Sequence, residues 1–426
     1  MVQIENEYGS YNCDKKYLSF LRDLIRKHLG NEIQLFTTDG PSLVKCGSID
    51  GAYPTVDFGV AEEKEVNKFF EMQKKFSKGG PLVNSEFYPG WFTLWNGGNP
   101  NLPTTNEVID TMTTMYNMNA SFSFYMFHGG TNFGFWNGAE VAGPVITSYD
   151  YGAPISEEGG ITPQYLAIQE WISKLPNWDT PPLATPKNNT ARNYGEVTVQ
   201  KFDNLLESFA KNPAPKCHQS ILPLSFEQID HPYGFVLYRK VLEFDGTNLT
   251  AENIKDHGFV YINDKAQGVL VDNLVKYSKK WISLSAKKGD ILTIIVENRG
   301  RQTYLSILDS KGLLPNVTLD GNILTNWNQC SIDFGPTLLN VTPNLLFKSF
   351  IKSVLTEDPF GKPMDNAGVY MGAFEIEGEI ADTWFNPGKF RKGQLFINGN
   401  NVGRYWPSAG PQVRDIRFAC LTEKVF

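Results

Sequence analysis

The sequence predicts an α/β region followed by an all-β region, and three observations along the chain support this fold class. From Glu7 to about Trp171, short apolar runs alternate with amphipathic stretches of helical period, which is typical of a parallel sheet. Residues 175–190, LPNWDTPPLATPKNNT, are rich in Pro, Thr and Asn and predict a linker. Beyond them, short strand-like runs separated by Gly and Asn turns indicate antiparallel β-sandwiches.

The α/β region contains about five strand-and-helix units, fewer than the eight of a closed β/α barrel. The expected strands lie in QIENEYG, NEIQLFTTDG, TVDF, PLVNSEF and SFSFYMF. Helical spacing predicts helices over 17–29, about 61–78 and about 104–118. The first of these ends at Gly30, a residue type that favours the position after a helix.

The all-β region contains an internal repeat. FVYINDKAQGVL around Asn263 resembles QLFINGNNVGRYW around Asn398, and in both an Ile-Asn pair is followed by a Gly five positions after the Asn. The two copies lie 135 positions apart, a reasonable size for one sandwich module. So short a pattern also occurs by chance in hairpin turns. The turn and the flanking strands agree as well, so we predict two related modules.

The composition excludes several classes of partner. A net charge of −7 and a pI near 5.4 argue against nucleic acid, because proteins that bind it usually carry a basic stripe. No apolar run approaches the roughly 18 to 20 residues that span a bilayer. The five His residues show no paired ligand spacing, so the sequence predicts no metal and no cofactor. It leaves the oligomeric state open.

Several sequence features concern the export of the protein. The start of the chain has neither a basic n-region nor an apolar h-region, so no signal peptide is predicted for it. Asn119 lies in a strand-like stretch, where we expect no glycan, and the five cysteines permit at most two disulfides. N-x-S/T sequons, which in this number indicate a secretory protein, occur at Asn119, Asn188, Asn248, Asn316 and Asn340.

Two acids, Glu7 in QIENEYG and Glu86 in LVNSEFYPGW, each end an apolar strand and are followed by aromatic residues and Gly. The carboxyl ends of the strands of a β/α barrel share one face, so the two acids should face each other. Glycosidic bond cleavage requires such a pair: one protonates the leaving oxygen, and the other attacks the anomeric carbon or activates a water. A lone strand-terminal Glu is more often salt-bridged or solvated, so the pairing carries the hypothesis. Glu5, on the strand face of Glu7, is interpreted as a structural acid deeper in the barrel.

Six motifs, ENEYGSY, LFTTDG, NSEFYPGW, YMFHGGTNFGFWNGA, TSYDYGAP and INGNNVGRYWP, occur in this order. Together they resemble glycoside hydrolase family 35, the acid or lysosomal β-galactosidases, from residue 2 nearly to the end of the chain. The resemblance implies part of a (β/α)8 TIM barrel, about strands 4–8, followed by two jelly-roll-like β-sandwich domains of the galactose-binding type. The expected domains are a partial barrel over 1–174, a linker over 175–200, and sandwiches over 201–335 and 336–426.

The resemblance also assigns roles. It implies a retaining exo-β-galactosidase that removes terminal β-D-galactose from glycans, with Glu7 as the acid/base and Glu86 as the nucleophile. Asn6 would hold the sugar near its 2-hydroxyl, and Tyr88 would orient Glu86. The residues expected to bind substrate are Asn6, Tyr88, Trp91, Tyr125 and Tyr149. For the aromatic residues, core packing at the mouth of the barrel is the alternative.

A family disulfide is matched by Cys13 and Cys46, which bracket the helix after strand 4. The bridge would close a loop of about 33 residues and contribute roughly 3 to 4 kcal/mol in the chain-entropy model. It would form only in an exported protein.

The chain also departs from the family pattern. Family members carry a signal peptide and barrel strands 1–3 ahead of ENEYGS, and with them part of the sugar pocket. We therefore expect an N-terminally truncated chain whose sheet has five strands and two open edges, from a parent that is lysosomal or secreted. Whether the truncated chain is active by itself stays open. The alternative function is a non-catalytic carbohydrate-binding or interaction protein that uses the two sandwiches.

Overall fold

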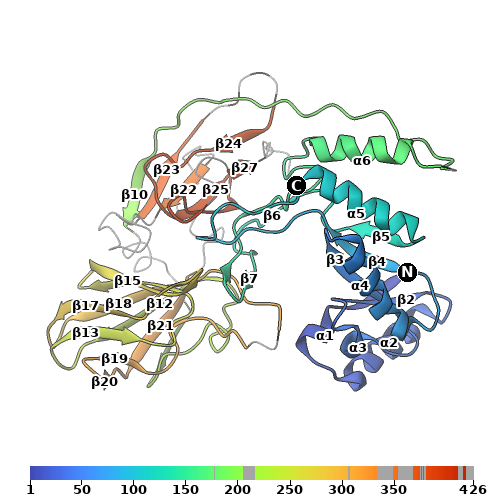
Figure 1. Cartoon of the computed structure of the whole chain (residues 1–426). Helices are drawn as coiled ribbons and strands as arrows, with labels where there is room; N and C mark the ends of the chain where they lie inside the picture. The colour runs from blue at the N-terminus through green and yellow to red at the C-terminus, as the bar shows by residue number, and fades with distance from the viewer. Residues whose placement is uncertain are drawn as a thin grey trace.

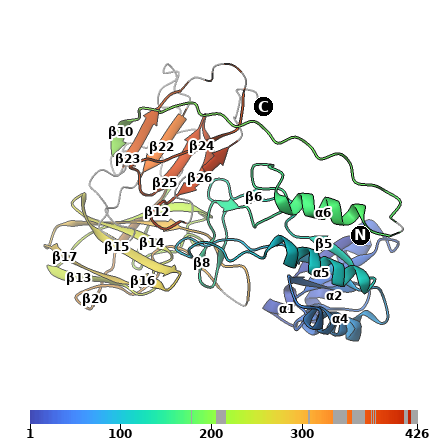
Figure 2. The same ribbon diagram turned by 45° about the horizontal axis from the view of Figure 1, so that its top comes forward.

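The computed structural model describes residues 1–176, 178–204, 216–305, 308–332, 349–353, 368–374, 376, 378, 380–410 and 416–418. An α/β region comes first, and two regions built of β-strands follow it (Figures 1 and 2). The sequon at Asn340, the fifth cysteine, Cys420, and the expected domain boundary at 335/336 lie outside the described residues. No helix of the described part has the length and apolar character needed to cross a membrane.

Five parallel strands form the sheet of the α/β region, in the order β1-β2-β3-β4-β5. They are β1 (Val2–Asn6), β2 (Leu35–Asp39), β3 (Tyr53–Gly59), β4 (Val83–Tyr88) and β5 (Ser121–Phe124). All five strands predicted from the sequence are present. Within the described residues β1 and β5 each pair on one side only, so the sheet is open and has two edges.

Helices follow the strands, and those at 15–29, 63–77 and 105–117 lie at the predicted places. They are α1 (Tyr8–Tyr11), α2 (Lys15–Leu29), α3 (Val44–Gly47), α4 (Glu63–Ser77), α5 (Thr105–Asn117) and α6 (Pro163–Ser173). Asp14 caps α2 by accepting from the amides of Lys16 and Tyr17, and Thr104 with Glu107 forms a capping box on α5. These caps define where the helices begin and therefore fix the loops that precede them.

The expectation for Asn119 was wrong. This residue lies in a turn between α5 and β5 at φ 58°, not in a strand, because Asn is one of the few residues that adopt a left-handed conformation after a helix. The side chain is exposed there, as are those of the other described sequon residues, Asn188, Asn248 and Asn316. The fold therefore removes the reason for excluding a glycan at Asn119.

Short strand pairs and an extended segment connect the α/β region to the rest of the chain. β6 (Gly130–Thr131) pairs with β9 (Ser148–Tyr149), and β7 (Ala139–Glu140) pairs with β8 (Gly143–Pro144). After α6, the described residues that lead to β10 form no helix and no named strand, and this segment crosses the top of the molecule in Figure 1.

Two sheets pack face to face in the first all-β region, and its apolar core lies between them. One has seven strands in the order β11-β21-β12-β18-β14-β15-β16, and the other has four in the order β17-β13-β19-β20. The strands are β11 (Cys217–Ser220), β12 (Gly234–Val241), β13 (Gly246–Ala251), β14 (His257–Ile262), β15 (Lys265–Leu274), β16 (Tyr277–Lys279), β17 (Trp281–Ala286), β18 (Ile291–Asn298), β19 (Val317–Leu319), β20 (Asn322–Ile323) and β21 (Trp327–Ile332).

The second all-β region has a five-stranded sheet in the order β10-β23-β22-β25-β26 and a two-stranded sheet of β24 and β27. Its strands are β10 (Gln200–Asn204), β22 (Ser349–Ser353), β23 (Gly368–Gly372), β24 (Thr383–Phe385), β25 (Gly393–Ile397), β26 (Asn400–Tyr405) and β27 (Ile416–Phe418). The expected domain limits differ here: residues 201–204 were assigned to the first sandwich, yet β10 pairs with β23 of the second. Linker composition does not reveal which sheet the next strand joins.

The internal repeat corresponds to two hairpins of the same construction. In the β14–β15 hairpin Ile262 pairs with Lys265, and in the β25–β26 hairpin Ile397 pairs with Asn400. Both turns place their two central residues at positive φ, at 263–264 and 398–399, as a two-residue type I′ turn requires. Each hairpin then has a register shift at the same distance from its turn. The match therefore extends from the sequence to the turn and the bulge.

Two disulfides close loops of very different length. Cys13 is joined to Cys46 across 33 positions, the pairing that the resemblance implies. Cys217 is joined to Cys330 across 113 positions, between neighbouring strands β11 and β21. No local pattern in the sequence indicates this second pair.

We expect the longer loop to contribute more stability. Replacing Cys217 and Cys330 together by Ala should lower the free energy of unfolding by about 4 to 5 kcal/mol, against about 3 to 4 kcal/mol for Cys13 and Cys46, because loop-closure entropy grows with loop length. Denaturant unfolding of both double variants under non-reducing conditions measures the difference. A smaller loss for the longer loop would contradict this expectation.

A buried ionic cluster joins the three regions. Glu297 of β18 accepts from Lys392, just ahead of β25, and from Arg404 Nε of β26 at 2.6 Å. Arg404 Nη1 also donates to Asn137 Oδ1 of the α/β region at 2.6 Å. The side chains of Glu297, Lys392 and Arg404 are each at most 4% exposed. The cluster thus fixes how the two all-β regions and the loop around Asn137 sit together.

Candidate active site

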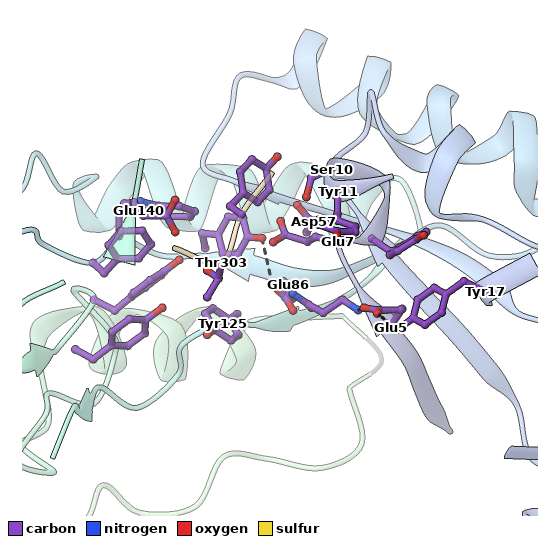
Figure 3. Close-up of a pocket in the computed structure, with 18 of the residues that line it drawn as sticks. Glu5, Glu7, Ser10, Tyr11, Tyr17, Asp57, Glu86, Tyr125, Glu140 and Thr303 are labelled. Carbon is purple, nitrogen blue, oxygen red and sulfur yellow. Dashed lines mark hydrogen bonds between the residues drawn. The ribbon is translucent and has the colours of Figure 1, made fainter. Parts of the chain in front are cut away.

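A cavity of about 1,060 Å³ lies at the carboxyl ends of the parallel strands, and it brings together every residue predicted to act on substrate. Those residues are Asn6, Glu7, Glu86, Tyr88, Trp91, Tyr125 and Tyr149. Figure 3 shows Glu7, Glu86 and Tyr125 directed toward the same space. Within the described part of the chain, none of the residues that line this cavity is Lys, Arg or His.

Glu7 follows β1 at the point where the strand becomes α1. Its amide donates to the Thr38 carbonyl of β2 at 2.8 Å, and its φ of 53° turns the chain sharply away from the sheet. This turn leaves the Glu7 side chain in the cavity lining. The pKa of Glu7 is raised by burial and by the charge of Glu140, while hydrogen bonding with Asp57 opposes the rise.

Glu86 lies on β4, and Tyr88 follows it on the same face of the strand. The Tyr88 hydroxyl donates to Glu86 Oε2 at 3.2 Å, a contact that the family resemblance implies. Burial and the negative charge of Glu7 raise the pKa of Glu86, while the Tyr88 hydrogen bond lowers it. The hydrogen bond therefore favours the ionised form of this carboxyl.

Two further carboxyls, which sequence reasoning did not select, lie at the ends of the strands between β1 and β4. Asp39 ends β2, is 1% exposed and accepts from the Gly9 amide at 2.8 Å. Asp57 lies on β3, is 5% exposed and pairs in register with Glu86. Both stand in the pattern that singled out Glu7, an apolar strand that ends in an acid close to a Gly, within LFTTDG and TVDFG. The same signal could therefore have found them.

Aromatic side chains form one wall of the cavity. The ring centroids of Tyr88 and Trp91 lie 5.1 Å apart, and those of Tyr149 and Tyr151 lie 5.4 Å apart in a stacked arrangement. Trp91 is 48% exposed, so it borders the opening of the cavity and is not a core residue. Tyr151 was not predicted, although it stands in the same TSYDY motif as Tyr149.

Glu5 also lines the cavity, where it is held by Tyr17 of α2. The Tyr17 hydroxyl donates to Glu5 Oε1 at 2.7 Å, and this bond raises the pKa of Tyr17 to about 12. Glu5 is half-buried. Its fixed position agrees with a structural acid, but it borders the cavity and does not lie deeper in the sheet.

Thr303 and Tyr304 complete the lining from the first all-β region. They follow β18 in the loop that begins near Arg299, close to 300 positions away from Glu7 in the sequence. Hydrogen bonding between Ser10 and Tyr304 links this loop to the α/β region. Nothing in the local sequence marks Tyr304 as part of the site, because its position depends on how the two regions pack.

Comparison with known proteins agrees with this architecture. Residues 1–175 match the model of glycosyl hydrolases family 35, residues 223–333 match the first all-β domain of β-galactosidase, and residues 367–416 match the β-galactosidase galactose-binding domain. Two curated mouse proteins are similar to the chain: a β-galactosidase-1-like protein, 39% identical, and a β-galactosidase, 37% identical, each over 96% of the chain. A human β-galactosidase is 38% identical over 97% of it.

The chain spans a little under two thirds of the length of these relatives, 62%, 64% and 62% respectively. The three matched models occur in order along it. With the parallel sheet that presents Glu7 and Glu86 to one cavity, these matches show that the chain belongs to glycosyl hydrolase family 35.

Proposed function

We propose that the chain is part of a retaining exo-β-galactosidase that releases terminal β-D-galactose from glycans. The observation that carries the proposal is that Glu7 and Glu86, from the ends of β1 and β4, line one cavity in which the charge of Glu7 raises the pKa of Glu86. In a retaining glycosidase two such carboxyls lie about 5 to 5.5 Å apart. The β-galactosidase names of the relatives give the sugar.

In the first step Glu86 attacks the anomeric carbon as Glu7 gives its proton to the leaving oxygen. The glycosidic bond breaks and a galactosyl ester forms on Glu86. In the second step Glu7 takes a proton from water, the water oxygen attacks the anomeric carbon, and Glu86 leaves as a carboxylate. The raised pKa of Glu7 supports its role as the acid of the first step. The hydrogen bond from Tyr88 to Glu86 supports the role of Glu86 as the nucleophile.

The cavity lining supports a neutral sugar. Glu86 is ionised under the proposed mechanism, and none of the described residues that line the cavity is cationic, so a uronic acid or another anionic sugar would be repelled. Asn6 would contact the 2-hydroxyl, and Trp91, Tyr125 and Tyr149 would contact the sugar ring. We also propose that the five parallel strands are the last five of a (β/α)8 barrel.

We further propose a lysosomal or secreted location for the protein. Two disulfides form in the structure, and such bonds persist in oxidising compartments. The four described sequon residues, Asn119, Asn188, Asn248 and Asn316, are exposed to solvent, where a glycan can be attached.

Covalent trapping tests the proposed function. A 2-deoxy-2-fluoro-β-galactoside with a good leaving group should form a stable galactosyl ester on Glu86, because fluorine slows the second step more than the activated first step. Mass spectrometry of the digested protein should place one fluorogalactosyl group on the peptide that contains Glu86, and none in Glu86→Gln. The corresponding fluoroglucoside, which differs at one hydroxyl, controls for specificity.

The alternative is a non-catalytic carbohydrate-binding protein, favoured by the match of residues 367–416 to a galactose-binding domain. It predicts no label on Glu86 together with galactose binding that survives when Glu7 and Glu86 are both changed to Gln. Calorimetry with galactose on that double variant separates the two functions, because the enzyme hypothesis places the sugar between these two carboxyls.

A further inference from the structure

The carboxyl of Asp57 lies among other acids, and none of the described groups that act most strongly on it is a cation. Glu7 faces it from the end of β1, Asp39 from the end of β2, and Glu86 with Tyr88 from β4. Glu140 in turn acts on Glu7. Lys15 acts on the neighbouring Asp39, where its charge partly offsets the rise in pKa that burial causes. Its ammonium is already bound to the carbonyls of Lys45, Cys46 and Ser48.

Asp57 also has an unsatisfied oxygen. Its Oδ2 is buried and accepts no hydrogen bond from any described residue. A buried carboxylate oxygen without a donor is costly. The carboxyl of Glu7, at the end of β1, forms a hydrogen-bonding contact with the carboxyl of Asp57.

Two ionised carboxylates cannot hydrogen bond to each other, because each is only an acceptor. One proton between them turns the contact into a strong bond and removes one of the two negative charges. The unsatisfied Oδ2 and the contact with Glu7 are therefore both accounted for when Asp57 carries a proton.

We propose that Asp57 is a positioning residue that remains protonated at neutral pH and donates a hydrogen bond to Glu7. This rests on the proposed function, in which Glu7 is the acid/base. When Glu7 gives its proton to the leaving oxygen, its O–H bond breaks and a new O–H bond forms on the leaving group. Asp57 keeps its own proton, and its hydrogen bond stabilises the negative charge that develops on Glu7.

The electrostatics of the site agree with the geometry. The pKa of Asp57 is raised to about 8, mainly by burial and then by repulsion from the charges of Glu7 and Glu86. The hydrogen bond with Tyr88 lowers the pKa and offsets only part of this rise. A carboxylic acid kept neutral in this way can act as a hydrogen-bond donor near neutral pH, a pattern known from other enzymes.

Titration of the carboxyl carbons tests the proposal without substrate. The folded chain is labelled with carbon-13 at the Asp side-chain carboxyl and followed by NMR as the pH rises from acid to about 9. One Asp signal should titrate near pH 8, and Asp57→Asn should remove it. Asp39→Asn is the matched control, since burial raises the pKa of Asp39 to about 7. The proposal fails if the signal that Asp57→Asn removes has already titrated below about pH 5, as ordinary aspartates do.

The direction of the change at Glu7 gives a second, independent test. With Glu carboxyls labelled, Asp57→Asn should leave the Glu7 midpoint nearly unchanged, because a neutral donor replaces a neutral donor. Asp57→Leu removes the donor and should raise the midpoint. If Asp57 were ionised, both changes would remove a repelling charge and lower the Glu7 midpoint, which would overturn the proposal.

Should Asp57→Asn fail to fold, Glu7→Gln serves instead: it removes the neighbouring charge and should lower the midpoint of the Asp57 signal.

Turnover provides a third readout. Asp57→Leu should lower kcat for an aryl β-galactoside with a poor leaving group about 100-fold, the scale of losing one preorganised donor to a developing charge. Asp57→Asn should recover most of this loss, with KM little changed in both. If Asp57 only supported the structure, Asp57→Asn would not restore kcat while leaving KM unchanged. The NMR titrations need no turnover, so failure of the trapping at Glu86 and failure of this proposal are distinguishable.

Discussion

Turnover of an aryl β-galactoside should fall about 10⁴-fold or more when Glu86 is changed to Gln, the scale of losing an activated nucleophile. Gln keeps the size of the side chain and can still accept from Tyr88, so the change removes the charge and leaves the packing of β4. The measurement is kcat/KM with an activated and with a poor leaving group, because kcat/KM reports the steps up to formation of the galactosyl enzyme and not its hydrolysis, in which Glu7 acts as the base. Under the proposed mechanism both substrates lose activity, because each needs the nucleophile.

Glu7→Gln provides the internal comparison. An activated aryl group leaves without protonation, so its formation of the galactosyl enzyme should be little affected, while the poor leaving group should lose most of its rate. The same change at Glu71, exposed on the outer side of α4, serves as the matched control and should leave both rates unaltered. Equal losses at Glu7 and Glu86 for every leaving group would contradict the assignment of roles.

The free energy of unfolding should fall by about 3 to 5 kcal/mol when Glu297 is changed to Gln, since removing one partner of a buried ion pair leaves the other charge uncompensated. Glu297 is 1% exposed and pairs with Lys392 and Arg404, both almost fully buried. The change would therefore leave two buried cations without an anion. Denaturant unfolding measures the loss. Asp245→Asn is the control, because its pair with Lys287 is exposed on both sides and should contribute little.

The same cluster predicts a pH dependence. Lys392 and Arg404 outweigh the effect of burial and lower the pKa of Glu297 to about 2, below its ordinary value of 4.5. A lowered folded-state pKa gives stability that is fully present above pH 4.5 and is lost as the pH falls toward 2. The acid limb of the stability curve should therefore be shallower in Glu297→Gln than in the wild type. Parallel curves for the two proteins would contradict the prediction.

The strands and the acid pair could be predicted because both depend on local pattern. Parallel strands place their carboxyl ends on one edge, so an acid that ends an apolar run has a known destination. Glu7 and Glu86 follow from this rule, and so do Asp39 and Asp57. A pair of Glu residues is enough to predict glycosidase chemistry, so the two Asp residues are not needed for that prediction.

Other features depend on tertiary pairing and have no local signal. β10 joins the sheet that contains β23, more than 160 positions later in the chain. The composition of the linker before β10 does not indicate which of the two all-β regions this strand will join. Tyr304 reaches the cavity only because the loop after β18 packs against the α/β region. The exposed turn at Asn119 depends on where α5 ends, and helix ends are the least certain part of a sequence prediction.

Because Thr303 and Tyr304 supply part of the cavity wall, the α/β region by itself does not contain the complete site. A fragment cut after residue 175, which would preserve the whole family 35 match, would keep Glu7, Asp57 and Glu86 but lose that part of the wall and expose the acids to water. The charges would then be screened by bulk solvent, and the raised pKa values that depend on burial would relax toward those of free carboxyls. Protein engineers who graft this α/β unit onto another scaffold would need to carry the loop after β18 with it.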